Sequence, residues 1–186
     1  MRIKIRDILK KLWPVLLMIW PYILGFWGDL EEVVGTEMAE VYLFFSVVVY
    51  VFNIINAFLY KGENAAYELA RFNMIMKIVH VPYYLLVFVI GGIFLCASVV
   101  PAFVLITPIM LILLFVTDVL LLVTSSMYGL NAIRRARKSG FISRKVAFKN
   151  LVMHFIFVLD VVSAINIFVK IRKRMRAEKL ANFPTF

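Results

Sequence analysis

Two acidic side chains lie deep inside long apolar stretches of this sequence, and this position makes them the strongest candidates for a chemical role. Asp118 is the single charged residue of the stretch 102–128, and Asp160 lies at the midpoint of the stretch 151–169. An ionisable group at the centre of a membrane helix costs about 2.5–3.5 kcal/mol, so it needs a partner or a function. No Lys or Arg occurs at a comparable depth, so we expect both carboxyl groups to be protonated or hydrogen-bonded to neutral side chains.

These carboxyl groups permit two interpretations. The first is a proton- or cation-coupled site at the centre of a helical bundle. Asn53 and Asn56 would contribute to it because residues three apart share a helix face. The second is interhelical hydrogen bonding of the kind that polar residues supply in membranes. His80 and His154 are expected near the cytoplasmic boundary, where they could relay protons to the aspartates or simply occupy the interface.

Catalytic and metal chemistry have little support. The sequence contains no HExxH, GxSxG, CxxC or phosphate-binding loop motif. Two histidines and one cysteine provide too few ligands for a metal site, and no motif predicts a cofactor. An intramembrane enzyme would depend on Asp118 and Asp160 as its acidic pair. We therefore expect a protein without catalytic activity.

Composition defines the class of protein that must position these residues. Apolar residues make up 63% of the 186 residues and charged residues 17%, with a mean hydropathy of +0.93. Globular domains average about 45–50% apolar and about 25% charged residues, and a soluble domain of this composition would expose large apolar patches. The long runs lack the period-two pattern of a membrane barrel. The sequence predicts an all-α, polytopic integral membrane protein with a single helical domain over residues 1–186.

Five apolar stretches are candidates for crossing a bilayer, because about 20 residues of helix span a hydrocarbon core of about 30 Å. Four of them predict firm transmembrane helices, at residues 12–28, 41–60, 78–100 and 102–128. Pro101 and Pro108 interrupt the third and fourth stretches, which predicts a tight helical hairpin. The cationic N-terminus resembles a signal peptide, but no small-residue cleavage site follows it, so we expect an uncleaved first span.

The fifth stretch, residues 151–169, is the weakest candidate because four of its residues are polar. It predicts either a spanning helix or a helix that is interfacial or re-entrant. Three of these four residues fall on one arc of a helix, together with the first cation of the basic tail 170–186, which suits packing on a bundle or lying in the interface. The arc consists of Asp160, Ser163, Asn166 and Lys170.

The distribution of charge predicts orientation and partners. The chain has 21 Lys and Arg against 11 Asp and Glu, a formal net charge of +10. The N-terminus and the loops 61–77 and 131–150 are cationic, whereas the loop 28–40 carries only acidic charges. The positive-inside rule therefore predicts a multi-pass protein of the plasma membrane with a cytoplasmic N-terminus. We expect contact with anionic headgroups, not with nucleic acid, from Arg134, Arg135, Arg137, Lys138, Arg172, Lys173, Arg174 and Arg176.

Three functional hypotheses follow. The leading hypothesis is a non-catalytic accessory or assembly subunit that binds a larger membrane protein or further copies of this chain. The alternative is a small proton- or cation-coupled transporter or channel that uses Asp118 and Asp160. The third, an intramembrane enzyme, rests on the same two aspartates.

Overall fold

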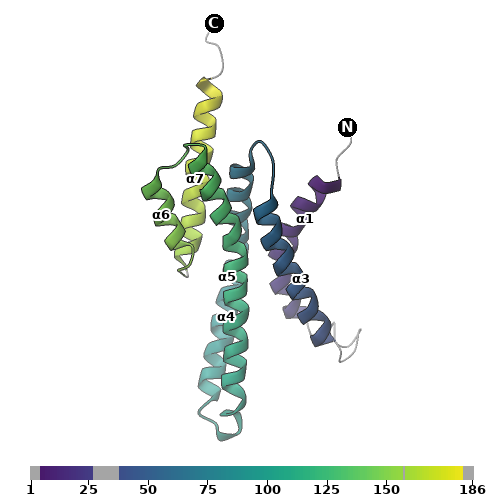
Figure 1. Ribbon diagram of the computed structural model, residues 1–186. Helices are drawn as coiled ribbons and strands as arrows, with labels where there is room; N and C mark the ends of the chain where they lie inside the picture. The colour runs from purple at the N-terminus through teal and green to yellow at the C-terminus, as the bar shows by residue number, and fades with distance from the viewer. Residues whose placement is uncertain (1–4, 27–37, 157, 182–186) are drawn as a thin grey trace.

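The computed structural model describes residues 5–26, 38–156 and 158–181, and over these residues the chain is helical without a β-strand (Figure 1). The elements are α1 (Ile5–Ile19), the 3-10 helix η1 (Trp20–Phe26), α3 (Met38–Leu59), α4 (Ala65–Ala97), the 3-10 turn η2 (Pro101–Phe103), α5 (Ile106–Lys138), α6 (Arg144–Met153) and α7 (Leu159–Ala181). Three helices, α3, α4 and α5, are long and apolar enough to cross a membrane. The expectation of an all-α chain is confirmed, whereas four spanning helices are not.

The helical hairpin of α4 and α5 forms the axis of the molecule. Each helix has 33 residues, which corresponds to about 50 Å at 1.5 Å per residue. The turn contains η2, which begins at Pro101, where the missing amide hydrogen prevents a continuous helix. The hairpin expected from the two prolines is therefore present. In Figure 1, α1 and α3 lie on one side of it and α7 on the other.

The buried core lies in one half of this hairpin. Leu69 and Met76 of α4 and Tyr128 and Ala132 of α5 are fully buried. Towards the η2 turn the same two helices leave the other elements, and Phe88 is 80% exposed there. The half of the hairpin away from the turn therefore positions the polar side chains.

The first predicted span is not one continuous α-helix. Helix α1 ends at Ile19, and the chain tightens into η1 at Trp20, immediately before Pro21. Proline lacks the amide donor that the next α-helical hydrogen bond needs, which explains the change. The indole of Trp20 donates to Ser46 of α3 over 2.8 Å and stacks on Tyr42. Residues 27 and 28 of the predicted span lie outside the described residues.

The fifth predicted span is also divided. Helix α6 runs from the end of α5 back along the hairpin, the chain reverses its direction between α6 and α7, and α7 returns to the same end (Figure 1). The 10 residues of α6 correspond to about 15 Å, half of a hydrocarbon core. The stretch 151–169 therefore contains the end of α6 and the first half of α7, and it is not a single spanning helix. Part of the basic tail, residues 170–181, continues α7.

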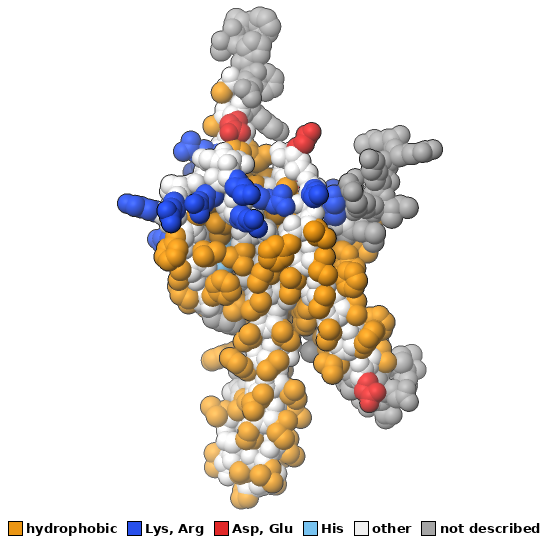
Figure 2. Space-filling view, viewed as in Figure 1, with side chains coloured by type: hydrophobic (Ala, Val, Ile, Leu, Met, Phe, Trp, Pro, Cys, Tyr) orange, Lys and Arg blue, Asp and Glu red, His pale blue; other side chains and the backbone are white. Residues whose placement is uncertain are grey.

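Positive charge gathers at one end of this structure. Figure 2 shows Lys and Arg side chains in a band across the visible face of the molecule, with apolar side chains covering the surface below it. The start of α1 and the end of α7 lie towards this end (Figure 1). The return of α7 brings its cations to the same end as those of α5 and α6.

Candidate functional site

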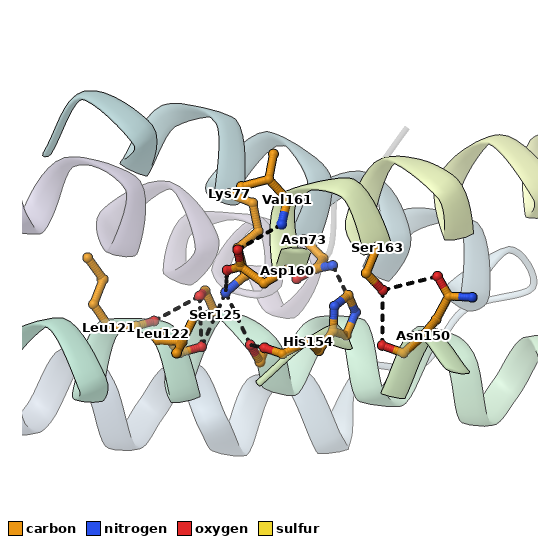
Figure 3. A network of polar contacts seen from close by, with 11 residues as sticks. Asn73, Lys77, Leu121, Leu122, Ser125, Asn150, His154, Asp160, Val161 and Ser163 are labelled. Atoms are coloured by element: carbon orange, nitrogen blue, oxygen red, sulfur yellow. Dashed lines mark hydrogen bonds and ion pairs between the residues drawn. The ribbon is translucent and has the colours of Figure 1, made fainter. Parts of the chain in front are cut away.

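A buried ion pair joins α4 to α7. The Nζ atom of Lys77 lies 2.7 Å from Oδ2 of Asp160, and the two side chains are 0% and 3% exposed (Figure 3). The same Nζ donates to the backbone oxygen of Leu122 over 3.3 Å and to Oγ of Ser126 over 3.1 Å. An ammonium group has three N–H donors, so all three donors have an acceptor. The expectation that Asp160 lacks a basic partner was therefore wrong.

Helical spacing explains how these side chains meet. Asn73, Lys77 and His80 are separated by four and three residues, so they form a polar stripe on one face of α4. Asp160 lies in the first turn of α7, where the helix dipole favours a carboxylate. Its second oxygen, Oδ1, accepts from the amide of Val161 over 2.8 Å. The turn between α6 and α7 brings this first turn of α7 to the stripe.

The turn itself is held by Ser126 and His154. Oγ of Ser126 donates to the backbone oxygen of His154 over 3.1 Å, while it accepts from Lys77. The His154 ring is fully buried, and its Nε2 lies 3.5 Å from Nδ2 of Asn73. A Cβ atom on Gly129 of α5 would lie 2.2 Å from the same Nε2. Only a glycine therefore leaves room for this ring against α5.

Asn150 closes the hairpin of α6 and α7. Oγ of Ser163 lies 3.0 Å from the backbone oxygen of Asn150 and 3.1 Å from its Oδ1. Nδ2 of Asn166 donates to the same Oδ1 over 3.1 Å. The polar arc predicted on this segment therefore faces α6 and α4.

Asp118 lies on α5 one helical turn before Leu122, whose backbone oxygen accepts from Lys77. It is half-buried on α5, within electrostatic range of Tyr50 of α3 and Tyr83 of α4. Its Oδ1 atom is buried and has no hydrogen-bond partner among the described residues. Asp160 is paired with Lys77, and both aspartates lie within electrostatic range of Tyr84 of α4.

The other predicted polar residues connect helices. The Tyr128 hydroxyl donates to Oδ1 of Asn53 over 2.8 Å and accepts from Nδ2 of Asn56 over 3.0 Å, which joins α3 to α5. Asn56 also donates to the backbone oxygen of Lys10 over 3.0 Å. His80 is fully buried, and its Nε2 lies 3.0 Å from the backbone oxygen of Leu17. Both histidines are thus inside the bundle, not on its surface.

Sequence reasoning missed Lys77, Ser126 and Gly129. Lys77 precedes the apolar stretch 78–100 and was counted with the cationic loop 61–77, although the four- and three-residue spacing from Asn73 to His80 marks a helix face. No local signal identifies Ser126 or Gly129, because their roles depend on where the turn of α6 and α7 falls.

The residues predicted to contact lipid headgroups lie in three different environments. Arg135 donates to the backbone oxygen of Tyr60 over 2.6 Å. The cations of α7 are exposed on that helix, at Arg172, Lys173, Arg174 and Arg176. The remaining three, Arg134, Arg137 and Lys138, line a groove beside α6. Within the described part of the chain, no group of three or more His, Cys, Asp or Glu could hold a metal ion.

Comparison with known proteins gives one match. The profile of a family of unknown function (DUF6652) matches residues 12–173. The match covers most of the chain and includes the Lys77–Asp160 pair, so the protein belongs to this family. No curated protein and no solved structure matches the sequence.

The buried pair should be strongly coupled. We expect Lys77→Met and Asp160→Asn each to lower the free energy of unfolding by about 3–5 kcal/mol, because each leaves a buried charge without its partner. The double variant should lose at least about 1 kcal/mol less than the sum. Lys173→Met, at an exposed cation of α7, should change it by about 0.5 kcal/mol or less. Denaturant unfolding of the purified chain in detergent measures all four, and additive single losses would contradict the coupling.

Two glycines provide a matched test of the His154 contact. We expect Gly129→Ala to lower the free energy of unfolding by about 1–3 kcal/mol, because the new Cβ overlaps the ring. Gly92→Ala in α4 meets no atom within 4 Å and should be neutral or stabilising by up to about 1 kcal/mol. Adding His154→Ala to Gly129→Ala should recover part of the loss. Chemical denaturation in detergent measures these changes, and equal effects of the two glycine variants would argue against the contact.

Proposed function

We propose that this DUF6652 member is a multi-pass membrane protein that serves as a non-catalytic accessory or assembly subunit. Helices α3, α4 and α5 would each cross the bilayer. The uncharged stretch 78–100 of α4 and its turn corresponds to about 35 Å, which matches a hydrocarbon core. Helix α1 and η1 together extend about 36 Å, because a 3-10 helix rises about 2.0 Å per residue. They would form the fourth crossing.

The hairpin of α6 and α7 would be re-entrant, or lie in the interface, on the cationic side. Its tip reaches Lys77, at the boundary of the uncharged stretch of α4. This arrangement places the cations of α7 on the same side as those of the loop 131–150, which agrees with the positive-inside rule. We therefore propose that this end, with the N-terminus, faces the cytoplasm at the plasma membrane.

The use of the polar side chains supports a structural role. Lys77 has an acceptor for each donor, and Asn53, Asn56 and Tyr128 bond to one another across helices. Polar contacts of this type hold membrane helices together. In this proposal they position the hairpins and perform no reaction.

The assembly role rests on the apolar side chains that are exposed in the half of the α4–α5 hairpin nearest to η2. Phe88 is 80% exposed, Leu105 82% and Phe115 69%. Helices α1 and α3 diverge from this part of the hairpin (Figure 1). When two helices pack side by side, each buries only one face of the other. A large apolar surface with aromatic side chains therefore remains for another membrane helix, in a larger partner or in a second copy.

Site-specific crosslinking tests this role. A photoreactive amino acid in place of Phe88 or Phe115 should give a discrete protein adduct in native membranes. The same probe in place of Phe44, which is 66% exposed on α3, should give lipid adducts only. Because the three positions are similarly exposed and apolar, the difference reports a partner and not exposure. Lipid adducts alone at all three positions would count against an assembly role.

Asp118 supports a second candidate function, proton- or cation-coupled transport. Its Oδ1 atom is buried without a partner among the residues described, and a membrane carboxyl group of this kind needs a proton or a cation. The engagement of Asp160 with Lys77 leaves Asp118 as the group on which this candidate depends.

A flux measurement tests the transport candidate. The purified chain in proteoliposomes should move protons under an imposed potential, and Asp118→Asn should abolish the flux while the unfolding midpoint changes little. Glu178→Gln, at an exposed acid near the end of α7, should leave the flux unchanged. No flux from the unmodified chain, or equal flux from the Asp118 variant, would rule this candidate out.

A further inference from the structure

A groove between α5 and α6 has a polarity gradient along its length. Its volume is about 660 Å³, which is on the scale of a small-ligand site. Arg134, Arg137 and Lys138 of α5 line it together with Arg144 of α6. On α6, Phe148 and Leu151 follow Arg144 at intervals of four and three residues, so they continue the same face. The groove is therefore cationic near the α5–α6 loop and apolar further along α6.

The cations of this groove have no acidic neighbour in the sequence. Residues 119–159 contain no Asp or Glu, and all four cationic side chains are exposed. No Asp or Glu is among the residues that line the groove, although Lys138 also lines a neighbouring pocket with Glu63 and Glu178. The three arginines repel one another, so an anion from outside the chain would stabilise them. Arginine favours phosphate oxygens, which its guanidinium can bind in a bidentate manner.

The apolar end of the groove identifies the kind of anion. Phe148 is 68% exposed, and Leu130 and Leu151 line the groove with it. A free phosphate would contact only the arginines and the lysine. A glycerophospholipid would place its phosphate among these cations and an acyl chain along Phe148 and Leu151.

We propose that the groove between α5 and α6 is a binding site for an anionic glycerophospholipid of the cytoplasmic leaflet. The inference rests on the membrane insertion in the proposed function, but not on the assembly role. The phosphate contacts Arg134, Arg137 and Arg144, and the chain along α6 provides the apolar part of the site. This assigns a defined site to part of the cationic band and leaves Arg135 as a contact between helices.

Lipid titration of the full chain tests the site. In detergent, phosphatidylglycerol should bind more tightly than phosphatidylcholine with the same acyl chains, with one lipid retained in native mass spectra. Arg134→Gln with Arg144→Gln should weaken phosphatidylglycerol binding about tenfold or more, since each cation near an anionic headgroup contributes to affinity. Lys145→Gln with Lys149→Gln removes the same charge from exposed positions of α6 that do not line the groove. This control should change the affinity less than about threefold.

Two further measurements distinguish binding of the whole lipid from binding of its headgroup alone. Phe148→Ala should weaken binding of phosphatidylglycerol, whereas glycerol phosphate and inorganic phosphate should bind weakly to all variants. Equal losses in the two double variants would show diffuse attraction and overturn the site. Tight binding of glycerol phosphate would show a soluble-phosphate site and overturn the lipid assignment. Failure of the chain to insert into phosphatidylcholine vesicles would instead refute the membrane insertion of the proposed function.

Discussion

The charge of Lys77 is the constraint on which the arrangement of the helices depends. A buried ammonium group is stable only when its charge is compensated and its donors are bonded. Helix α5 supplies Leu122 and Ser126, but neither carries a negative charge. The carboxylate comes from Asp160, at the start of α7, so the chain must turn back at the end of α6 to deliver it. The same requirement explains why the stretch 151–169 is divided between α6 and α7.

The turn that delivers Asp160 carries a local backbone cost. Val158 has a φ of 71°, in the left-handed region that β-branched residues rarely adopt, at a cost of about 1–3 kcal/mol. Three contacts near Val158 oppose this cost. They are the Lys77–Asp160 ion pair, the hydrogen bond from Ser126 to the His154 backbone oxygen, and the hydrogen bond from Ser163 to the Asn150 backbone oxygen. Gly129 permits the approach of His154 that this packing requires.

Local sequence patterns predicted the helices and the α4–α5 hairpin, but not the partners of the buried polar side chains. The apolar runs and Pro101 predicted helices and the α4–α5 hairpin, because both follow from composition and from the missing donor of proline. Two features differ from the expectation. The first stretch is not one continuous α-helix, because α1 ends at Ile19 just before Pro21, so a firm span there is not confirmed. The partner of Asp160 was missed because the depth of Lys77 depends on where α6 and α7 fold, which is a tertiary feature that no local period encodes. Asp160, Asn53 and Asn56 were identified as buried polar positions, but their partners came only from the structure.

The contrast between the two halves of the α4–α5 hairpin follows from the same physics. Lipid chains are as apolar as leucine, so apolar side chains alone do not draw membrane helices together, and polar contacts or small residues must do so. Near the cationic end, the Lys77 network, the Tyr128 bonds and Gly129 meet this requirement, and α3, α6 and α7 pack against the α4–α5 hairpin. Towards the turn, polar residues give way to Leu, Ile, Val and Phe, and the other helices separate from the hairpin. Gly92 lies in that half with nothing within 4 Å of its added Cβ, so no helix of the described chain packs against α4 at this position.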